Sequence, residues 1–298
     1  MCGIVGLFLK DSALEPDLGR LLAGMLGTMS DRGPDSAGFA VYGSPHAGMT
    51  KITVQSATPD AAFEHLAESV GAAISAPVTL CCRSTHAVLT APADKANAAR
   101  DAIRGAHPQV RIMSVGEAIE IFKEVGNPRE VAQRFDLASM SGTHGIGHTR
   151  MATESAVTTL GAHPFSTGPD QCLVHNGSLS NHNNLRRGMA REGVSFETEN
   201  DSEVAAAYLT TQMDHGLTLG AAMEKSLGDL DGFFTFVVGN RNGFGVLRDP
   251  IACKPAVLAE TEAYVAFGSE FRALAALPDI DQAKVWEPEP ATVYFWER

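Results

Sequence analysis

Residues 1–8 read MCGIVGLF, with a cysteine at position 2 and a short apolar run behind it. The run is partly β-branched and short, so it predicts a buried strand. Initiator methionine is usually removed before a small residue, which would give Cys2 a thiol and a free α-amino group. That amine has a pKa near ~7.7–8.0, so part of it is neutral and can take the thiol proton. Taken alone, a cysteine here is more often a buried structural residue.

The composition is that of an ordinary globular protein with a real core. The chain has 298 residues, of which 44% are hydrophobic and 19% charged. Its net charge of -12 argues against nucleic acid or an anionic membrane as partner, because both need excess Lys and Arg. The sequence has no apolar run near the ~20 residues that span a bilayer, and no secretory leader pattern. We therefore expect a cytoplasmic protein.

The five cysteines are an odd set without metal-site spacing. The chain is also too large for a disulfide scaffold. We expect a reducing compartment, no metal site, and mostly buried thiols that act as small apolar side chains. The same reasoning predicts that Cys81 and Cys82 lie in a buried strand.

The chain divides into three blocks. The first, to about residue 43, predicts a strand, a helix within residues 15–33 and further strands. The second, to about residue 142, alternates strands with helices, including a helix at residues 116–126, and predicts a small α/β subdomain inserted at about 55–140. The third groups long helices and strands. The whole chain, 1–298, is thus expected to form one α+β domain with mostly antiparallel sheets.

Two polar clusters follow strand-like runs. Arg150, in GHTRMAT, can grip a carboxylate with two parallel hydrogen bonds, although a surface ion pair is the commoner fate of one arginine. Asn176 and Gly177, in HNG, can offer a side-chain amide and a backbone N–H as an oxyanion hole. A plain Asn-Gly turn is the competing interpretation.

A third cluster, ENDSEV, places Asp201 before an alanine-rich helix. The ordinary interpretation is an N-cap. The functional interpretation is a carboxylate that holds a substrate ammonium, and both can be true if the pocket lies beside the helix start.

Six segments together resemble the class II glutamine amidotransferases: MCGIVGLF, DRGPDSAGFA, GHTRMAT, GAHPF, HNGSLSNHNNLR and NDSEV. They follow in the family's order over about 200 residues. The resemblance implies an N-terminal nucleophile (Ntn) hydrolase fold, a four-layer αββα sandwich of mostly antiparallel sheets. It also implies cleavage of the glutamine side-chain amide to glutamate and ammonia.

The resemblance assigns roles by matching motif. Cys2 is then the nucleophile, with its own α-amino group as base. Asn176 and Gly177 form the oxyanion hole. The other roles are Arg150 for the glutamine carboxylate, Asp201 for its ammonium, Thr153 in the pocket wall, Arg32 and Gly33 as support for the nucleophile, and structural roles for His148, His163 and His175.

Two features depart from the familiar family members. Met151 stands where many relatives have an aromatic residue, and Glu154 is unusual beside the glutamine pocket. The chain shows no second, ammonia-using domain and no phosphate loop, and its inserted block is long. It therefore looks most like the amidotransferase subunit of glutamate synthase-like systems, in particular of N-methylglutamate synthase.

That resemblance implies a hetero-oligomer. Glutamine is the substrate, a separate synthase subunit accepts the ammonia, and this chain has no cofactor, since flavin and iron–sulfur clusters belong to partner chains. Two alternatives stay open: an independent hydrolase of another γ-glutamyl amide, and a non-catalytic assembly or regulatory subunit. Retention of Met1 would favour the last, because Cys2 would then lack a free amine.

Overall fold

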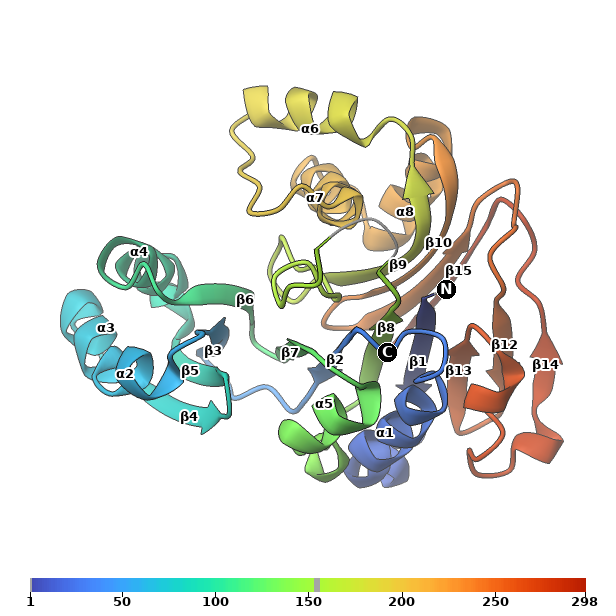
Figure 1. The fold of residues 1–298 in the computed structure, drawn as a ribbon, viewed down its shortest axis with the longest axis horizontal. Coiled ribbons are helices and arrows are strands. Elements are labelled where there is room, and N and C mark those ends of the chain that lie inside the picture. The colour runs from blue at the N-terminus through green and yellow to red at the C-terminus, as the bar shows by residue number, and fades with distance from the viewer. Residues whose placement is uncertain (1, 153–155) are drawn as a thin grey trace.

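The strand that follows Cys2 lies at the centre of a seven-stranded antiparallel sheet (Figure 1). The computed structural model describes residues 2–152 and 156–298. The sheet's strands, in spatial order, are β14 (Lys284–Trp286), β12 (Val257–Glu260), β13 (Tyr264–Gly268), β1 (Gly3–Leu9), β8 (His144–Arg150), β2 (Ser36–Tyr42) and β7 (Ile119–Val125). Because β13 and β8 flank β1, the segment behind Cys2 is fixed on both edges.

A second, four-stranded antiparallel sheet stacks on the first. Its strands, in spatial order, are β15 (Thr292–Glu297), β11 (Gly243–Arg248), β10 (Gly232–Gly239) and β9 (Cys172–Leu179). Side chains alternate along a strand, so Ile4 and Phe8 of β1 face this second sheet and pack in one core with Val237 and Phe244. This core joins the strand of Cys2 to the strand that carries Asn176.

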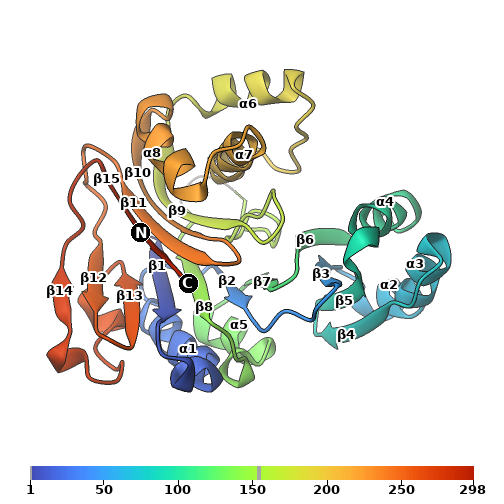
Figure 2. The same cartoon turned by 180° about the vertical axis from the view of Figure 1, so that it is seen from behind.

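Helices cover the two outer faces. Val5 and Leu7 of β1 point away from the second sheet and pack under α1 (Leu18–Thr28), beside α5 (Pro128–Arg134). On the other side, α7 (Asp201–Asp214) and α8 (Leu219–Asp229) cover the four-stranded sheet, and α6 (His182–Arg191) lies over α7 (Figure 2). The predicted α+β fold, with two antiparallel sheets between helical layers, is confirmed.

A third sheet lies at the side of this sandwich (Figures 1 and 2). Its strands, in spatial order, are β4 (Thr79–Arg83), β5 (His86–Pro92), β3 (Met49–Gln55) and β6 (Arg111–Gly116). It shares a core of its own with α2 (Pro59–Phe63), α3 (Leu66–Ile74) and α4 (Ala96–Ala106). We refer to residues 49–116 as the inserted subdomain. The remainder of the stretch predicted as an insertion, including β7 and α5, packs with the main body.

Short 3₁₀ helices connect several elements. They are η1 (Ser12–Asp17), η2 (Ala93–Lys95), η3 (Leu137–Ser139), η4 (Phe271–Ala273) and η5 (Ile280–Gln282). Within residues 2–152 and 156–298, no helix combines the length and the apolar character that a membrane crossing needs.

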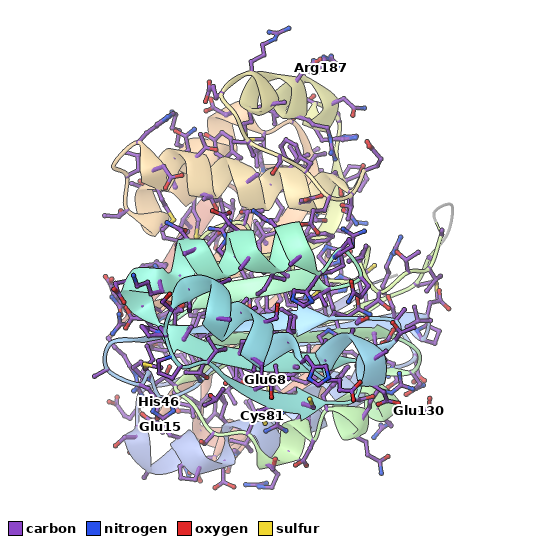
Figure 3. All side chains as sticks on the ribbon, turned by 90° about the vertical axis from the view of Figure 1, so that its left-hand side faces the viewer. Glu15, His46, Glu68, Cys81, Glu130 and Arg187 are labelled. Atoms are coloured by element: carbon purple, nitrogen blue, oxygen red, sulfur yellow. The ribbon has the colours of Figure 1, made fainter. Side chains whose placement is uncertain are left out.

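Two sequence expectations are wrong. Residues 116–126 contain the strand β7 rather than a helix, because they pair with β2 along its whole length, from Ser36–Val125 to Tyr42–Ile119. The thiols are not mostly buried: Cys81 (Figure 3) and Cys82 are exposed, since β4 is an edge strand. Cys172 is the one fully buried cysteine of the described chain.

Candidate functional site

The backbone of Cys2 is held from two sides. Its carbonyl oxygen accepts a hydrogen bond from Arg32 Nε at 3.1 Å and another from Asn176 Nδ2 at 3.3 Å. Arg32 follows α1, whereas Asn176 comes from β9 in the other sheet. The Cys2 side chain itself is only partly buried. The structure thus brings three predicted site residues together at the open end of β1.

Arg32 is in turn fixed by a residue from the far end of the chain. Its guanidinium forms an ion pair with Glu270, and the second carboxylate oxygen of Glu270 accepts from Arg272 Nε at 2.6 Å. Because two arginines surround it, the pKa of Glu270 is held below its usual range, chiefly by the Arg32 hydrogen bond. Arg32 is 9% exposed and Glu270 34%, so the guanidinium is shielded from solvent while the carboxylate is partly hydrated.

Gly33 lets this turn cross the end of β8. A Cβ at position 33 would lie 2.4 Å from the carbonyl carbon of Thr149 and 2.5 Å from the nitrogen of Arg150. Any side chain would therefore push the turn away and move Arg32 with it. Gly33 therefore supports the site through the close approach of its backbone to that of Thr149 and Arg150.

Asn176 and Gly177 lie inside β9, which continues to Leu179, so the Asn-Gly turn is excluded. Gly177 has a φ of +144°, and a Cβ there would lie 1.9 Å from the carbonyl oxygen of Phe233. Only glycine tolerates both conditions. The strand therefore presents the Asn176 amide and the Gly177 backbone in a fixed order beside Cys2.

Arg150 is the last residue of β8 and is 9% exposed. Its NH1 donates to the carbonyl oxygen of Gly161 at 3.3 Å, and Asn200 Nδ2 donates to the same oxygen at 3.4 Å. Asp35 fixes the chain around it: its N–H donates to the Arg150 carbonyl at 3.1 Å, and its carboxylate accepts from Ala152 N at 2.7 Å. The contact at Gly161 places Arg150 near the start of α7.

Asp201 is the first residue of α7, but it is not the N-cap. The cap is Asn200, whose side chain accepts from Ser202 N at 2.9 Å. This frees the Asp201 carboxylate, which accepts from Leu179 N at 2.9 Å and lies 3.7 Å from His175 Nδ1. Burial alone would raise the pKa of Asp201, yet His175 and the Leu179 N–H outweigh it and lower the pKa to about 2. Asp201 is therefore an anion at neutral pH.

Three buried histidines pack behind Asp201. His148 and His163 stack with ring centroids 4.0 Å apart. His163 and His175 both bond Ser202 Oγ, at 2.8 and 3.0 Å. Burial lowers the pKa of His148 to about 3 and that of His163 well below its usual value. Through these contacts the three rings brace α7 against β8 and β9.

Lys123 is a site component that the sequence did not reveal. It is 5% exposed, and its Nζ donates to three carbonyl oxygens, of Leu160, Ala162 and Pro164, at 3.2, 2.8 and 3.2 Å. The ammonium also lies 4.6 Å from the ring centroid of Phe165. Lys123 thereby fixes the segment that contains Gly161, the shared partner of Arg150 and Asn200.

The predicted site residues thus fall into two joined groups. One holds Cys2 through Arg32 and Asn176, with Gly33 and Gly177 as their backbone neighbours. The other holds Arg150 and Asp201 around Gly161 and Asn200, and Leu179 N connects Asp201 to β9. Thr153 and Glu154, also expected near the pocket, lie outside the described residues. Sequence reasoning missed Asp35, Lys123, Asn200 and Glu270, although Asp35 and Asn200 stand inside quoted motifs.

Solved structures identify the class of fold. One reported as the allosteric regulatory enzyme of purine biosynthesis superposes with a TM-score of 0.65 at 19% identity, over 99% of this chain and 47% of that one. The glutamine phosphoribosylpyrophosphate amidotransferase from B. subtilis gives 0.63, also at 19% identity and with the same coverage. The αββα sandwich is accordingly that of the Ntn-type glutamine amidotransferases.

Sequence comparison gives the family. Residues 148–276 match the model of the glutamine amidotransferase domain. A glutamine amidotransferase-like protein, GlxB, of Rhizobium meliloti (strain 1021) is 65% identical, covering 100% of this chain and 98% of its own. A putative glutamine amidotransferase of Methanothermobacter thermautotrophicus is 33% identical over 99% of each. The chain belongs to the class II glutamine amidotransferase family, whose members are enzymes.

Proposed function

We propose that the chain hydrolyses the side-chain amide of glutamine through a thioester on Cys2 and passes the ammonia to a separate synthase subunit. The observation that carries this proposal is the pair of hydrogen bonds that Arg32 and Asn176 donate to the Cys2 carbonyl. It supports the proposal because a candidate oxyanion donor contacts the backbone of the candidate nucleophile, which precedes a strand paired on both edges.

The first half of the reaction forms the thioester. With Met1 removed, the α-amino group of Cys2 takes the thiol proton, and the thiolate attacks the amide carbon. Asn176 Nδ2 and the Gly177 N–H stabilise the resulting oxyanion. The C–N bond then breaks, and the ammonium form of the α-amino group returns its proton to the leaving nitrogen, which departs as ammonia.

The second half uses water. The α-amine takes a proton from water as its oxygen attacks the thioester carbon. The C–S bond breaks, the thiolate is reprotonated, and glutamate leaves. The 3.3 Å bond from Asn176 to the Cys2 carbonyl is longer than the usual ~2.9–3.0 Å. It is therefore a weak resting contact that the oxyanion can replace.

Substrate recognition rests on two opposite charges. Arg150 binds the α-carboxylate of glutamine, and Asp201 binds its α-ammonium. Asp201 suits this task because its low pKa keeps it ionised. By matching motif, Thr153 is also proposed to contribute to glutamine binding.

The ammonia acceptor is proposed to be a synthase of the glutamate synthase or N-methylglutamate synthase type. The described residues form the αββα body and the inserted subdomain, and neither supplies a second catalytic centre by its motifs. Relatives named glutamine–fructose-6-phosphate aminotransferase, such as one from Vibrio vulnificus (strain YJ016), match over 40% of this chain but only 20% of their own length. We accordingly propose a cytoplasmic hetero-oligomer in which flavin and iron–sulfur clusters, where present, belong to the partner.

The test is glutamine hydrolysis by the purified protein, alone and with its partner subunits. Ammonia and glutamate should appear in equal amounts, and Cys2→Ala should abolish both. Cys81→Ala, an exposed cysteine on β4, is the matched control and should keep full activity. Intact-mass measurement should show loss of Met1. Failure to release ammonia under either condition would overturn the proposal.

A second candidate is hydrolysis of a larger γ-glutamyl amide. It is favoured by Met151, an apolar side chain that is 38% exposed immediately after Arg150. Bulky γ-glutamyl amides turned over faster than glutamine would support this alternative.

A further inference from the structure

A cavity of about 310 Å³ lies between the inserted subdomain and the main body. Helix α4 and strand β6 form one wall. The C-terminal half of α7 and residues 193–198 form the other, on the side that faces α4 in Figure 1. The volume is at the small end of the range for metabolite sites.

The wall on α4 is cationic. Arg100 and Arg104 are four residues apart, hence on one face of the helix, and both line the cavity. Neither forms an ion pair with any described residue. Arg100 Nε is buried without a hydrogen-bond partner there. Burial, and next the charge of Arg104, lower the pKa of Arg100. Two guanidinium groups that repel each other at a cavity wall are a receptor for an anion.

The opposite wall is anionic. Glu197 and Asp214 line it, are exposed, and likewise form no ion pair with any described residue. Asp214 ends α7, where the helix dipole disfavours a negative charge and a bound cation would relieve it. The other charged groups of the cavity are already engaged: Lys123 by three carbonyls, and Glu203 by the N–H groups of residues 197 and 198.

We propose that this cavity binds a small α-amino acid, with its carboxylate between Arg100 and Arg104 and its ammonium at Glu197 and Asp214. Opposite charges that line one cavity and form no ion pair across it among the described residues suit a ligand that carries both charges. This site is separate from the glutamine site, which uses Arg150 and Asp201.

Two segments connect this cavity to the residues of the proposed glutamine site. Lys123 lines the cavity and fixes the segment around Gly161, and residues 193–198 lead directly to Asn200 and Asp201. If the proposed glutaminase activity holds, occupancy of the cavity should change KM for glutamine. This second step rests on the proposed function, whereas binding itself does not.

The experiment is calorimetric titration of the full chain with glycine, L-alanine, L-serine and L-aspartate. Acetate and methylamine, each carrying one of the two charges, are the single-charge probes. At least one amino acid should bind saturably, and affinity should fall about ten-fold or more in R100A/R104A and in Asp214→Asn. Arg111→Ala, an exposed arginine of the same subdomain outside the cavity, is the matched control and should bind as the native chain does.

Three results would overturn the proposal: no saturable binding by any amino acid, binding unaffected in R100A/R104A, or acetate binding as tightly as the amino acids. Since R100A/R104A could disturb folding, R100K/R104K keeps the charge and removes the planar fork, and should bind at an intermediate level. The heat signal does not require hydrolysis. A chain that binds the amino acid but releases no ammonia would refute the glutaminase and leave this site standing.

Discussion

Glu270 connects the end of the chain to its beginning. It holds Arg32, and Arg32 holds the carbonyl of Cys2. Neither residue is proposed to touch glutamine, so both act by positioning the nucleophile. A charged hydrogen bond of this kind is stronger than a neutral one, and its loss leaves a buried guanidinium unpaired.

We therefore expect Glu270→Gln to lower kcat for glutamine hydrolysis about ten-fold and to leave KM within a factor of about two, because a misplaced nucleophile affects the chemical step more than binding. The Cys2 thiol should also react more slowly with iodoacetamide in this variant. Arg272→Gln, which removes only the more exposed partner of Glu270, is the control and should have a smaller effect. An unchanged kcat would contradict the positioning role.

Asp201→Asn should affect KM for glutamine more than kcat, the reverse of Glu270→Gln. The amide oxygen can still accept from Leu179 N, so the fold should persist, while the charge facing the substrate ammonium is lost. We expect KM for glutamine to rise about 10- to 100-fold with a smaller change in kcat. Asp94→Asn, an exposed carboxylate of the inserted subdomain, should leave KM unchanged. Equal effects of the two substitutions would argue against Asp201 as the ammonium partner.

At the scale of elements, Lys123 of β7 holds residues 160–164 by hydrogen bonds to their backbone. Replacing it with Met keeps much of the aliphatic length but removes the donor for three carbonyls. We expect Lys123→Met to lower the free energy of unfolding by about 2–4 kcal/mol, since buried acceptors would be left unpaired. Urea denaturation measures this change. Lys51→Met is the comparison. It removes a single ion pair between β3 and Glu120 of β7, so it should lower the free energy of unfolding by less.

Most elements could be predicted from local pattern, because caps and apolar periodicity are local signals. Asn127-Pro128 does begin α5, with Asn127 as its cap. The elements that escaped include β7 and α6. The segment of β7 is rich in helix formers, and only its pairing with β2 makes it a strand. Helix α6 is polar almost all round, with Met189 as its buried residue, so it has no strong apolar face to detect.

The site residues also fall into those that a local sequence pattern reveals and those that only the fold brings into the site. Cys2, Asn176 and Asp201 stand in short motifs, so the sequence alone is enough to single them out. Glu270 could not be found in this way, because its partner Arg32 is 238 residues away in the chain. Lys123 lies in a segment without a motif, and its role depends on how a distant loop folds back over β7.

At the scale of the whole molecule, buried histidines make stability depend on pH. His86, His144 and His148 are at most 1% exposed, and burial lowers the pKa of each to about 3. Burial also lowers the pKa of His163 well below its usual value. Their unfolded pKa is about 6.5. Between these values the unfolded chain binds protons that the native chain does not, so stability is full above about pH 6.5 and is lost as the pH falls toward 3.

Each of the four should contribute a slope of about 1.4 kcal/mol per pH unit well below pH 6.5. We expect the free energy of unfolding to fall steeply between about pH 6 and 4, as measured by urea denaturation at several pH values. His86→Gln should reduce the slope by about one quarter. His65→Gln, at an exposed position, should leave it unchanged. A flat profile over this interval would show that these rings are protonated in the native state.

The central place of β1 has a consequence for synthesis. Its pairing of Val5 with Gly268 joins residues 263 positions apart. A ribosome adding roughly 5–20 residues per second needs roughly 15–50 s to travel that distance. Throughout this interval β1 lacks its neighbour β13, so one edge of the strand has no pairing partner. The sheet is therefore complete around β1 only after β13 has emerged, late in synthesis.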